Sequence, residues 1–266
     1  MSEQLPSDQL RTVYGPVPSR RFGNSLGIDL IYSTSACSFR CVYCQLGRIQ
    51  SATMERQKFV DTSRVVHDFE ESNWRAAERV TFSGSGEPTL ASNLGEVISK
   101  LRQRSKKTML VLTNGSLLQN PTVRSELALA DEVACKIDAA DEATFSRIHR
   151  AVDDLDLAGV IAGLRLFRKE FEGRLIIQTM LLPVNSGKME EIARLIGSLG
   201  ADEVHLTVPI RPAPREWTLA TRGDRQIMSD TGSFRIPPAA QVVAIAREME
   251  RSSGVRVRPF TDSADA

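Results

Sequence analysis

Residues 27–47 read GIDLIYSTSACSFRCVYCQLG, and this stretch decides the fold. It joins a short apolar run, residues 27–32, to a loop that carries Cys37, Cys41 and Cys44. A short apolar run is typical of a strand buried in a parallel sheet, where the loops that follow the strands form the active face. The sequence therefore predicts a strand at 27–32 and places the three cysteines at the catalytic end of an α/β fold.

The pattern of the first strand recurs along the chain. Further apolar, β-branched runs lie at residues 79–84, 108–114, 131–138, 174–182 and 202–210. Amphipathic segments separate the runs and predict helices at residues 63–77, 94–105, 121–129, 143–150, 154–170 and 188–199. This alternation indicates βα units, and the right-handed crossover rule places the helices outside the curved sheet. The fold expected is α/β, a partial (βα)6 barrel of the TIM type.

The two ends of the chain flank this barrel. After residue 210 the pattern becomes irregular as far as residue 234, and a last helix at 238–252 and a closing strand at 255–260 follow. No linker, internal repeat or low-complexity tract stands out in the sequence. We therefore expect a single domain over residues 1–266, with an N-terminal arm at 1–26, a barrel core at 27–210 and a C-terminal extension at 211–266.

The composition is that of an ordinary globular protein, with 41% hydrophobic and 25% charged residues. The 34 basic and 33 acidic side chains leave a formal charge of +1, which argues against a general electrostatic grip on nucleic acid but leaves a local basic patch open. The first ten residues lack the pattern of a signal peptide, and no window approaches the roughly 20 apolar residues of a membrane span. The expected location is the cytoplasm, with no part in the membrane.

The three clustered cysteines predict a metal centre rather than disulfides. The fourth cysteine, Cys135, lies far along the chain, which is a poor arrangement for a disulfide framework. Thiolates suit iron or zinc, and three of them can bind three irons of a cubane cluster and leave the fourth iron open. The alternatives are a zinc site completed by one of the three histidines and a dithiol switch between Cys41 and Cys44. A structural zinc usually takes four protein ligands, and the chain offers no second cysteine pair, so the cluster is favoured.

The spacing of the loop, CxxxCxΦC with Tyr43 as the aromatic residue Φ, resembles the signature of the radical S-adenosylmethionine (SAM) superfamily. The resemblance implies that Cys37, Cys41 and Cys44 hold a [4Fe-4S] cluster whose open iron binds the amino and carboxylate groups of SAM, with Tyr43 beside the adenine. It also implies an enzyme in which one-electron reduction cleaves the sulfonium and yields a 5′-deoxyadenosyl radical. The expected barrel is then the partial barrel of the radical SAM type.

A second motif, FSGSGEPTL at residues 82–90, spans the end of the next predicted strand. Its Ser85, Gly86 and Glu87 resemble the GGE motif of the same superfamily, with serine in place of the first glycine. Small residues let the backbone approach a ligand, and the Glu87 carboxylate can accept a charge-assisted hydrogen bond from the amino group of SAM. The alternative is an ordinary Gly-Ser turn that binds nothing.

Polar side chains also end the third and fourth predicted strands. Asn114 closes the third, and Lys136 and Asp138 close the fourth. The resemblance matches these positions to residues that hold the carboxylate and ribose hydroxyls of SAM, a role that their hydrogen-bonding groups suit. Many superfamily members carry serine at the position of Lys136. The alternatives are that Asn114 makes a turn and that Asp138 caps the following helix.

Two later strands carry polar residues within apolar runs. By strand alternation Gln178 shares a face with Met180, and His205 shares a face with Thr207. If these faces look into the barrel, Gln178 and His205 contact cofactor or substrate; if they do not, the residues are satisfied surface groups. Cys135 lies on the opposite face of its strand from the predicted site and is expected to be a buried structural thiol rather than a cluster ligand.

Two arginine pairs are further candidates for ligand binding. Arg20 and Arg21 precede the first strand and are expected near the barrel opening, where a guanidinium pair can bind a phosphate or carboxylate. The alternative is an arm that covers the edge of the barrel. Arg211 and Arg215 follow the sixth strand and have the same two interpretations.

Within the superfamily, the course from VPSRRFG through FSGSGEPTL, KIDAADEATF and PIRPAP resembles the branch of the wyosine-synthase-like Fe-S oxidoreductases. The second-cluster cysteines of the tRNA wyosine synthases are absent, since no cysteine precedes Cys37 and only Cys135 follows Cys44. The alternatives are a glycyl-radical-enzyme activating enzyme, which acts on a protein glycine, and an enzyme for a small molecule, nucleoside or tRNA. A non-catalytic metal-binding module on a barrel scaffold is the alternative without enzyme activity. No flavin or second cluster site is evident, so the electron donor is expected to be a separate protein such as reduced flavodoxin or ferredoxin.

Overall fold

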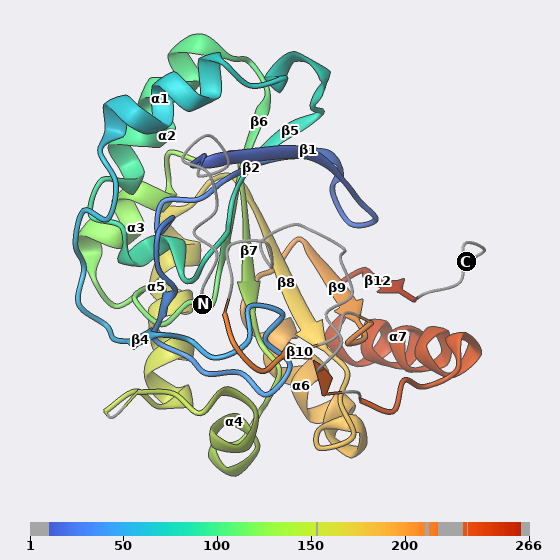
Figure 1. Cartoon of the computed structure of the whole chain (residues 1–266). Helices are drawn as coiled ribbons and strands as arrows, with labels where there is room; N and C mark the ends of the chain where they lie inside the picture. The colour runs from blue at the N-terminus through green and yellow to red at the C-terminus, as the bar shows by residue number, and fades with distance from the viewer. Residues whose placement is uncertain (1–10, 153, 211–212, 218–230, 233, 262–266) are drawn as a thin grey trace.

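The centre of the molecule is one curled sheet of eight strands (Figure 1). The computed structural model describes residues 11–152, 154–210, 213–217, 231–232 and 234–261. In spatial order the strands are β1 (Val13–Ser19), β2 (Gly23–Ile28), β5 (Arg79–Phe82), β6 (Thr108–Thr113), β7 (Glu132–Lys136), β8 (Arg174–Met180), β9 (Glu203–Thr207) and β12 (Val257–Phe260). β1 is antiparallel to β2, and the neighbouring pairs from β2 to β12 are parallel.

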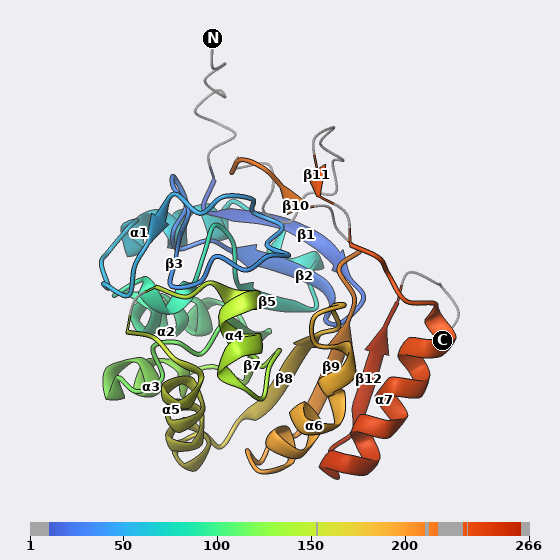
Figure 2. The ribbon, with the colours of Figure 1, turned by 90° about the horizontal axis from the view of Figure 1, so that it is seen from below.

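Helices line the outside of the sheet (Figure 2). They are α1 (Thr62–Glu70), α2 (Leu94–Arg104), α3 (Pro121–Leu127), α4 (Glu142–His149), α5 (Leu157–Glu170), α6 (Met189–Gly197) and α7 (Ala239–Ser253). α5 buries an apolar stripe of Leu157, Val160, Ile161, Leu164 and Phe167 against the sheet, as its spacing predicts. The parallel sheet with helices on its outer side confirms the predicted α/β partial barrel.

The first strand of the core differs from its prediction. The apolar run at 27–32 predicts a strand through residue 32, but β2 begins at Gly23 and ends at Ile28. The Asp29 carboxylate accepts the backbone N–H groups of Ile31 (3.1 Å) and Tyr32 (2.9 Å), which turns the chain away from the sheet. Leu30 and Ile31 are nevertheless buried, so their apolar character reflects packing of a loop rather than a strand.

A β-hairpin precedes the barrel. β1 and the first residues of β2 lie within the segment expected to be an N-terminal arm, and the turn between them carries Phe22 inward against the His205 ring, with 5.2 Å between ring centroids. The helix predicted from residue 154 begins instead at Leu157, because the Asp156 side chain caps it through the N–H of Gly159 (2.7 Å). The predicted closing strand is confirmed as β12, parallel to β9.

Side chains fill the inside of the half-barrel in two layers. Phe22, Leu110, Ala134 and Ile176 form a small apolar cluster on the face of the sheet away from the helices. Nearer the amino ends of the strands, ion pairs run across the sheet and connect Arg79, Glu132, Arg174, Glu203 and Arg258 in that order. Because these side chains fill the barrel near the amino ends of the strands, a site has room only at the carboxyl ends, where the loops that follow the strands can form it. None of the helices among the described residues is long and apolar enough to cross a membrane.

Candidate functional site

The cysteine loop leaves the carboxyl end of β2 and folds back over the barrel. Cys37 ends the short strand β3 (Ala36–Cys37), which pairs with β4 (Ser51–Ala52). The backbone N–H of Cys44 donates to the carbonyl of Cys41 (3.0 Å), and the N–H of Gly47 donates to the carbonyl of Cys44 (3.1 Å), so two successive turns hold the second half of the loop. All three cysteines are half-buried. The structure thus brings the three predicted ligands together at the predicted end of the barrel.

Backbone hydrogen bonds dock the loop on two neighbouring elements. On one side, the N–H of Arg40 donates to the carbonyl of His149 (2.8 Å), at the end of α4. On the other side, the N–H of Ala36 donates to the carbonyl of Ser85 (3.1 Å), and the N–H of Glu87 donates to the carbonyl of Ala36 (2.9 Å). The position of the thiols is therefore fixed by the turn after β5 and by α4.

Gly86 allows this docking because its backbone lies directly against Ala36. A Cβ at Gly86 would stand 1.8 Å from the carbonyl oxygen of Ala36. The predicted role of this small residue was close approach to a ligand; the close approach observed is to the cysteine loop itself.

Replacing Gly86 with alanine is expected to displace the cysteine loop. The added methyl group meets backbone, so the free energy of unfolding should fall by about 2 kcal/mol, and iron bound after reconstitution should drop. Gly187→Ala is the matched control, because a Cβ there would meet nothing within 4 Å. Urea unfolding and iron analysis of both variants test this expectation. Equal iron content and stability in the two variants would show that the loop tolerates the extra atom.

The chemistry of the thiols suits a metal that binds thiolate. Burial raises the pKa of Cys37, Cys41 and Cys44, and the charge of Cys44 raises the pKa of Cys37 and Cys41 further. Without metal the thiols are therefore protonated, whereas a bound metal cation deprotonates a coordinating thiol. No group of three or more histidine, cysteine or acidic side chains in the described part of the chain is arranged to hold a single metal ion.

Glu87 is buried behind the loop, and its carboxylate accepts four hydrogen bonds. Its Oε1 accepts hydrogen bonds from the backbone N–H (3.1 Å) and hydroxyl (2.7 Å) of Thr89 and from the hydroxyl of Thr113 (2.6 Å). Its Oε2 accepts one from the backbone N–H of Asn114 (2.7 Å). Burial raises the pKa of Glu87, and these donors lower it. Three donors share Oε1, whereas Oε2 accepts a single hydrogen bond, so Oε2 has room for one more donor.

Ser85 and Asn114 hold the neighbouring loops. The Ser85 hydroxyl donates to Oδ2 of Asp29 (2.7 Å), which ties the turn after β5 to the end of β2. Asn114 Oδ1 accepts a hydrogen bond from the N–H of Ser116 (2.9 Å). This bond forms the turn that the sequence offered as the alternative to a ligand role. Asn114 Nδ2 donates to the Ser38 hydroxyl (2.9 Å) and approaches the Cys37 sulfur at 3.5 Å. Asn114 therefore makes the turn and also contacts the cysteine loop.

Asp138 is the centre of a polar group beside Tyr43. The Tyr43 hydroxyl donates to Asp138 Oδ2, and the backbone N–H of Met180 donates to Oδ1 (2.6 Å). Lys136 Nζ lies 3.7 Å from Oδ1 and 4.9 Å from the centroid of the Tyr43 ring. The helix cap considered for Asp138 is supplied instead by Asp141, whose carboxylate accepts the N–H of Thr144 (3.0 Å). Tyr43, Lys136 and Asp138 thus come together as the sequence predicted.

Gln178 stands next to this group on β8, in register with Lys136 on β7 and His205 on β9. Its side chain is 4% exposed, and among the described residues its Nε2 has no hydrogen-bond partner. A buried amide without a partner costs about 1–3 kcal/mol unless a water or ligand accepts its hydrogens. Gln178 therefore fits a site that is completed by a bound molecule.

His205 is in register with Gln178 on the neighbouring strand, but its ring contacts two aromatic rings and a carboxylate. The ring is buried between Phe22 and Phe260, and its Nε2 lies 2.8 Å from Oε1 of Glu203. The surface-group interpretation of His205 is wrong, because only 1% of the residue is exposed. Burial lowers its pKa to about 4, so the ring is neutral at neutral pH.

The neutral His205 predicts a loss of stability in mild acid. An unfolded chain binds a proton on this ring near pH 6.5, whereas the folded chain binds it only near pH 4. The stabilisation is therefore present above pH 6.5 and is lost as the pH falls toward 4, by up to about 1.4 kcal/mol per pH unit. His205→Gln should flatten the pH dependence of the free energy of unfolding over this range, as measured by urea titrations of the metal-free protein. Parallel pH profiles for the two proteins would contradict the assignment.

The remaining candidates lie outside the cluster of site residues. Cys135 is confirmed as a buried core thiol, and burial raises its pKa to about 12. Arg20 donates to the carbonyl of Thr261 just after β12, so it spans the gap between the hairpin and the far edge of the sheet, which supports the interpretation as an edge cover. The Arg21 guanidinium lies 5.4 Å from the centroid of the Phe22 ring. Arg211 lies outside the described residues.

A short part of the C-terminal extension contacts the cysteine loop. The N–H of Arg48 donates to the carbonyl of Arg215 (3.2 Å), and a Cβ at Gly47 would stand 2.7 Å from the carbonyl oxygen of Pro214. Gly47 has a φ of +73°, a conformation that favours glycine. Residues 213–217 therefore cover the end of the loop that carries the cysteines.

From the sequence, His149 entered only as one of the three histidines that could complete a zinc site, with no contact to a particular cysteine predicted. His149, on α4, is buried, and its Nδ1 lies 3.2 Å from the Cys41 sulfur. Its Nε2 lies 3.7 Å from Oδ2 of Asp138. The available signal was an imidazole on the apolar stripe of the predicted helix at 143–150, next to Phe145 and Ile148.

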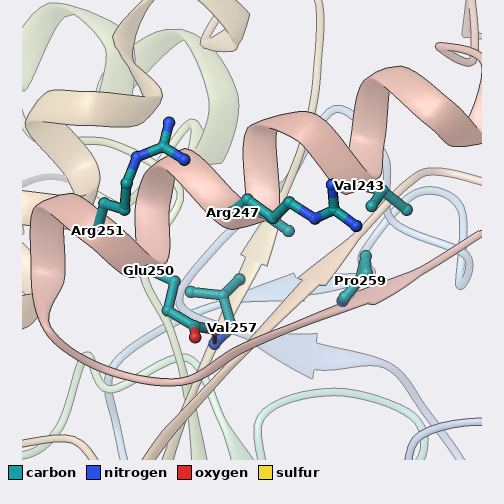
Figure 3. A pocket seen from close by; sticks show the side chains of 7 residues that line it. Val243, Arg247, Glu250, Arg251, Val257 and Pro259 are labelled. Atoms are coloured by element: carbon teal, nitrogen blue, oxygen red, sulfur yellow. Dashed lines mark hydrogen bonds between the residues drawn. The ribbon is translucent and has the colours of Figure 1, made fainter.

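The groove of about 400 Å³ between α7 and β12 is separate from these residues (Figure 3). It lies at the far edge of the sheet from β2. Its lining residues are Val243, Ala246, Arg247, Glu250, Arg251, Val257 and Pro259. None of the predicted site residues lines it.

Comparisons with known proteins bear on the whole arrangement. The family model described as "Radical SAM superfamily" matches residues 31–196. The chain is 41% identical to the UPF0026 protein slr1464 of Synechocystis sp. over 213 residues, an alignment that covers 80% of each chain. The fold of the present chain is similar to that of a radical SAM methyltransferase from Sphaerobacter thermophilus, with a TM-score of 0.60 and 16% identity over 89% of this chain and 66% of that one.

A second solved structure has the same fold. Streptococcus suis SuiB, bound to S-adenosylmethionine, matches with a TM-score of 0.60 and 11% identity. The match covers 86% of this chain but only 49% of SuiB, so this chain spans about half the length of that relative. The likeness to the wyosine synthase branch stays a prediction. Because the family model matches more than half of the sequence, we conclude that the chain belongs to the radical SAM superfamily.

Proposed function

We propose that Cys37, Cys41 and Cys44 hold a [4Fe-4S] cluster and that the enzyme cleaves SAM reductively to abstract hydrogen from a substrate. Enzymes of the radical SAM superfamily use this cluster and SAM. The observation that carries the proposal is the set of three thiols at the carboxyl end of β2, with Asn114 Nδ2 at 3.5 Å from the Cys37 sulfur and His149 Nδ1 at 3.2 Å from the Cys41 sulfur. Nitrogen donors beside the ligands are typical of cluster sites.

Side chains at the ends of β5 to β8 would bind SAM. The free capacity of Glu87 Oε2 supports a hydrogen bond from the amino group of SAM. Gln178 Nε2, which lacks a partner among the described residues, supports a second contact, and the Lys136 ammonium over the Tyr43 ring supports an adenine site with a cation beside it. The residues proposed to form the SAM site, by contact with SAM or by holding the residues that contact it, are Tyr43, Ser85, Gly86, Glu87, Asn114, Lys136, Asp138 and Gln178.

The roles within this set follow from the contacts. Ser85 and Gly86 hold the cysteine loop through Asp29 and Ala36, so they position the site rather than touch SAM. Asp138 holds the Tyr43 hydroxyl and would fix the ring that faces the adenine. A reduced cluster held by the three cysteines would supply one electron to the sulfonium of SAM bound by these residues, and the cleavage would give methionine and a 5′-deoxyadenosyl radical able to take a hydrogen atom from the substrate.

The electron must come from a donor protein, because radical SAM enzymes need one. We infer a small carrier such as reduced flavodoxin or ferredoxin.

The single-domain organisation, with a core at 27–210 and flanking segments at 1–26 and 211–266, belongs to the same proposal. Candidate substrates are a protein glycine, a nucleoside or tRNA, and a small molecule. SAM deuterated at the 5′ carbon can identify the substrate, because hydrogen transfer between the substrate and the 5′ carbon leaves a mass change in the molecule that takes part.

Anaerobic reconstitution with iron and sulfide tests the cofactor assignment. We expect about four irons and four sulfides per chain, and a reduced-cluster EPR signal that changes when SAM is added. Cobalt or zinc added alone serves as the comparison for a simple metal-binding module. A chain that binds zinc but no iron–sulfur cluster, or a cluster whose EPR signal ignores SAM, would contradict the proposal.

A further inference from the structure

The contact between His149 and Cys41 joins residues 108 positions apart in the sequence. Cys41 lies in the loop after β2, and His149 is the last residue of α4. The same junction carries the backbone bonds from Arg40 N–H to the His149 carbonyl and from Val42 N–H to the Ile148 carbonyl (2.9 Å). His149 therefore contacts the cysteine loop through its backbone carbonyl as well as through its imidazole ring.

The ring is also fixed by packing. Its centroid lies 4.7 Å from that of Phe39 and 5.0 Å from that of Phe145, and the side chain is 2% exposed. Nδ1 faces the Cys41 sulfur, while Nε2 faces Asp138, whose oxygens already accept Tyr43 and Met180. A ring confined in this way offers the sulfur one fixed nitrogen.

We propose that His149 is a positioning residue that donates an Nδ1–H hydrogen bond to the Cys41 thiolate and raises the reduction potential of the cluster. This inference rests on the proposed cluster at the three cysteines. A cysteine that binds iron has lost its proton, so a hydrogen bond between the two atoms requires the hydrogen to be on Nδ1. Hydrogen bonds to ligand sulfurs stabilise the more negative, reduced cluster and so raise its potential.

Redox titration monitored by EPR measures this effect on reconstituted protein. His149→Leu removes the donor, and the equilibrium constant for reduction should fall about tenfold, which corresponds to a potential about 59 mV more negative for one electron. His149→Gln keeps an N–H donor and should restore part of the difference. His67→Leu, which removes an exposed imidazole from α1, is the matched control and should leave the potential near that of the wild type.

A wild-type measurement keeps the inference testable if the leucine variant does not assemble a cluster. Protein labelled with ¹⁵N-histidine should show a weak ¹⁵N hyperfine coupling in pulsed EPR of the reduced cluster. An intact wild-type cluster without this coupling, or equal potentials in the wild type and His149→Leu, would overturn the role of His149 and leave the proposed function standing. A wild-type chain that assembles no cluster would overturn both.

Discussion

Replacing Cys41 with alanine is expected to abolish cluster assembly and SAM cleavage together. Cys41 is one of three thiols at the carboxyl end of β2, and no other thiol is near enough to replace it, since the fourth cysteine is buried in the core beside Gly115. Loss of one of three ligands leaves two irons of the cubane without protein ligands. We expect iron content after reconstitution to fall to background and 5′-deoxyadenosine production to become undetectable.

Cys135→Ala is the control for this experiment. It removes a thiol of the same chemistry from the hydrophobic core, so it should cost stability while it preserves iron content and SAM cleavage. Iron analysis, visible absorption and product analysis by chromatography compare the two variants directly. A Cys41→Ala protein that retains a full cluster would contradict the assignment of Cys41 as a ligand. A Cys135→Ala protein that loses the cluster would contradict the assignment of Cys135 as a core thiol.

Removal of the Glu87 carboxylate is expected to have the second large effect, first on stability. Glu87→Ala leaves four donors without their acceptor: the N–H and hydroxyl of Thr89, the hydroxyl of Thr113 and the N–H of Asn114. Buried donors that lose a charged acceptor cost more than an ordinary hydrogen bond, so we expect the free energy of unfolding to fall by about 4 kcal/mol. Urea unfolding of the metal-free protein measures this loss.

A milder variant separates the structural role of Glu87 from its proposed contact with SAM. Glu87→Gln can keep the three bonds on Oε1 and loses only the bond from the Asn114 N–H, because it places an amide NH₂ at the position of Oε2, where the amino group of SAM would bind. We expect a cluster-loaded Glu87→Gln protein to bind SAM about tenfold more weakly, a difference of about 1.4 kcal/mol. Thr113→Val removes one bond from Oε1 and is the control, with unchanged SAM affinity. Normal SAM binding by Glu87→Gln would show that this carboxylate only supports the loops.

The predictable part of the molecule is the part that local patterns encode. The cysteine spacing and the alternation of apolar runs with amphipathic segments predicted the barrel and the end of it at which Cys37, Cys41 and Cys44 lie. The polar residues at strand ends were predictable too, because the carboxyl ends of parallel strands meet at one face. Tyr43 therefore meets Lys136 and Asp138, although it lies on the cysteine loop and they lie at the end of β7.

Contacts of individual side chains, most of them between distant segments, account for what the patterns missed. The end of β2 depends on the Asp29 side chain, which stops the strand inside an apolar run. The partner of Arg20 is a carbonyl 241 positions away, and that of the Cys41 sulfur is an imidazole 108 positions away. Two of the four hydrogen bonds to Glu87 likewise join the turn after β5 to the end of β6. The periodicity of apolar residues predicts which face of a helix or strand is buried, but it does not predict which side chain of another segment will contact that face.

The most direct test of the central claim is SAM cleavage by the reconstituted protein. The cluster-loaded wild-type chain, reduced with dithionite under anaerobic conditions and supplied with SAM, should release 5′-deoxyadenosine and methionine in equal amounts, and the Cys41→Ala chain treated in the same way should release neither. A wild-type chain that carries an intact, reducible [4Fe-4S] cluster and binds SAM but releases no 5′-deoxyadenosine would contradict the account.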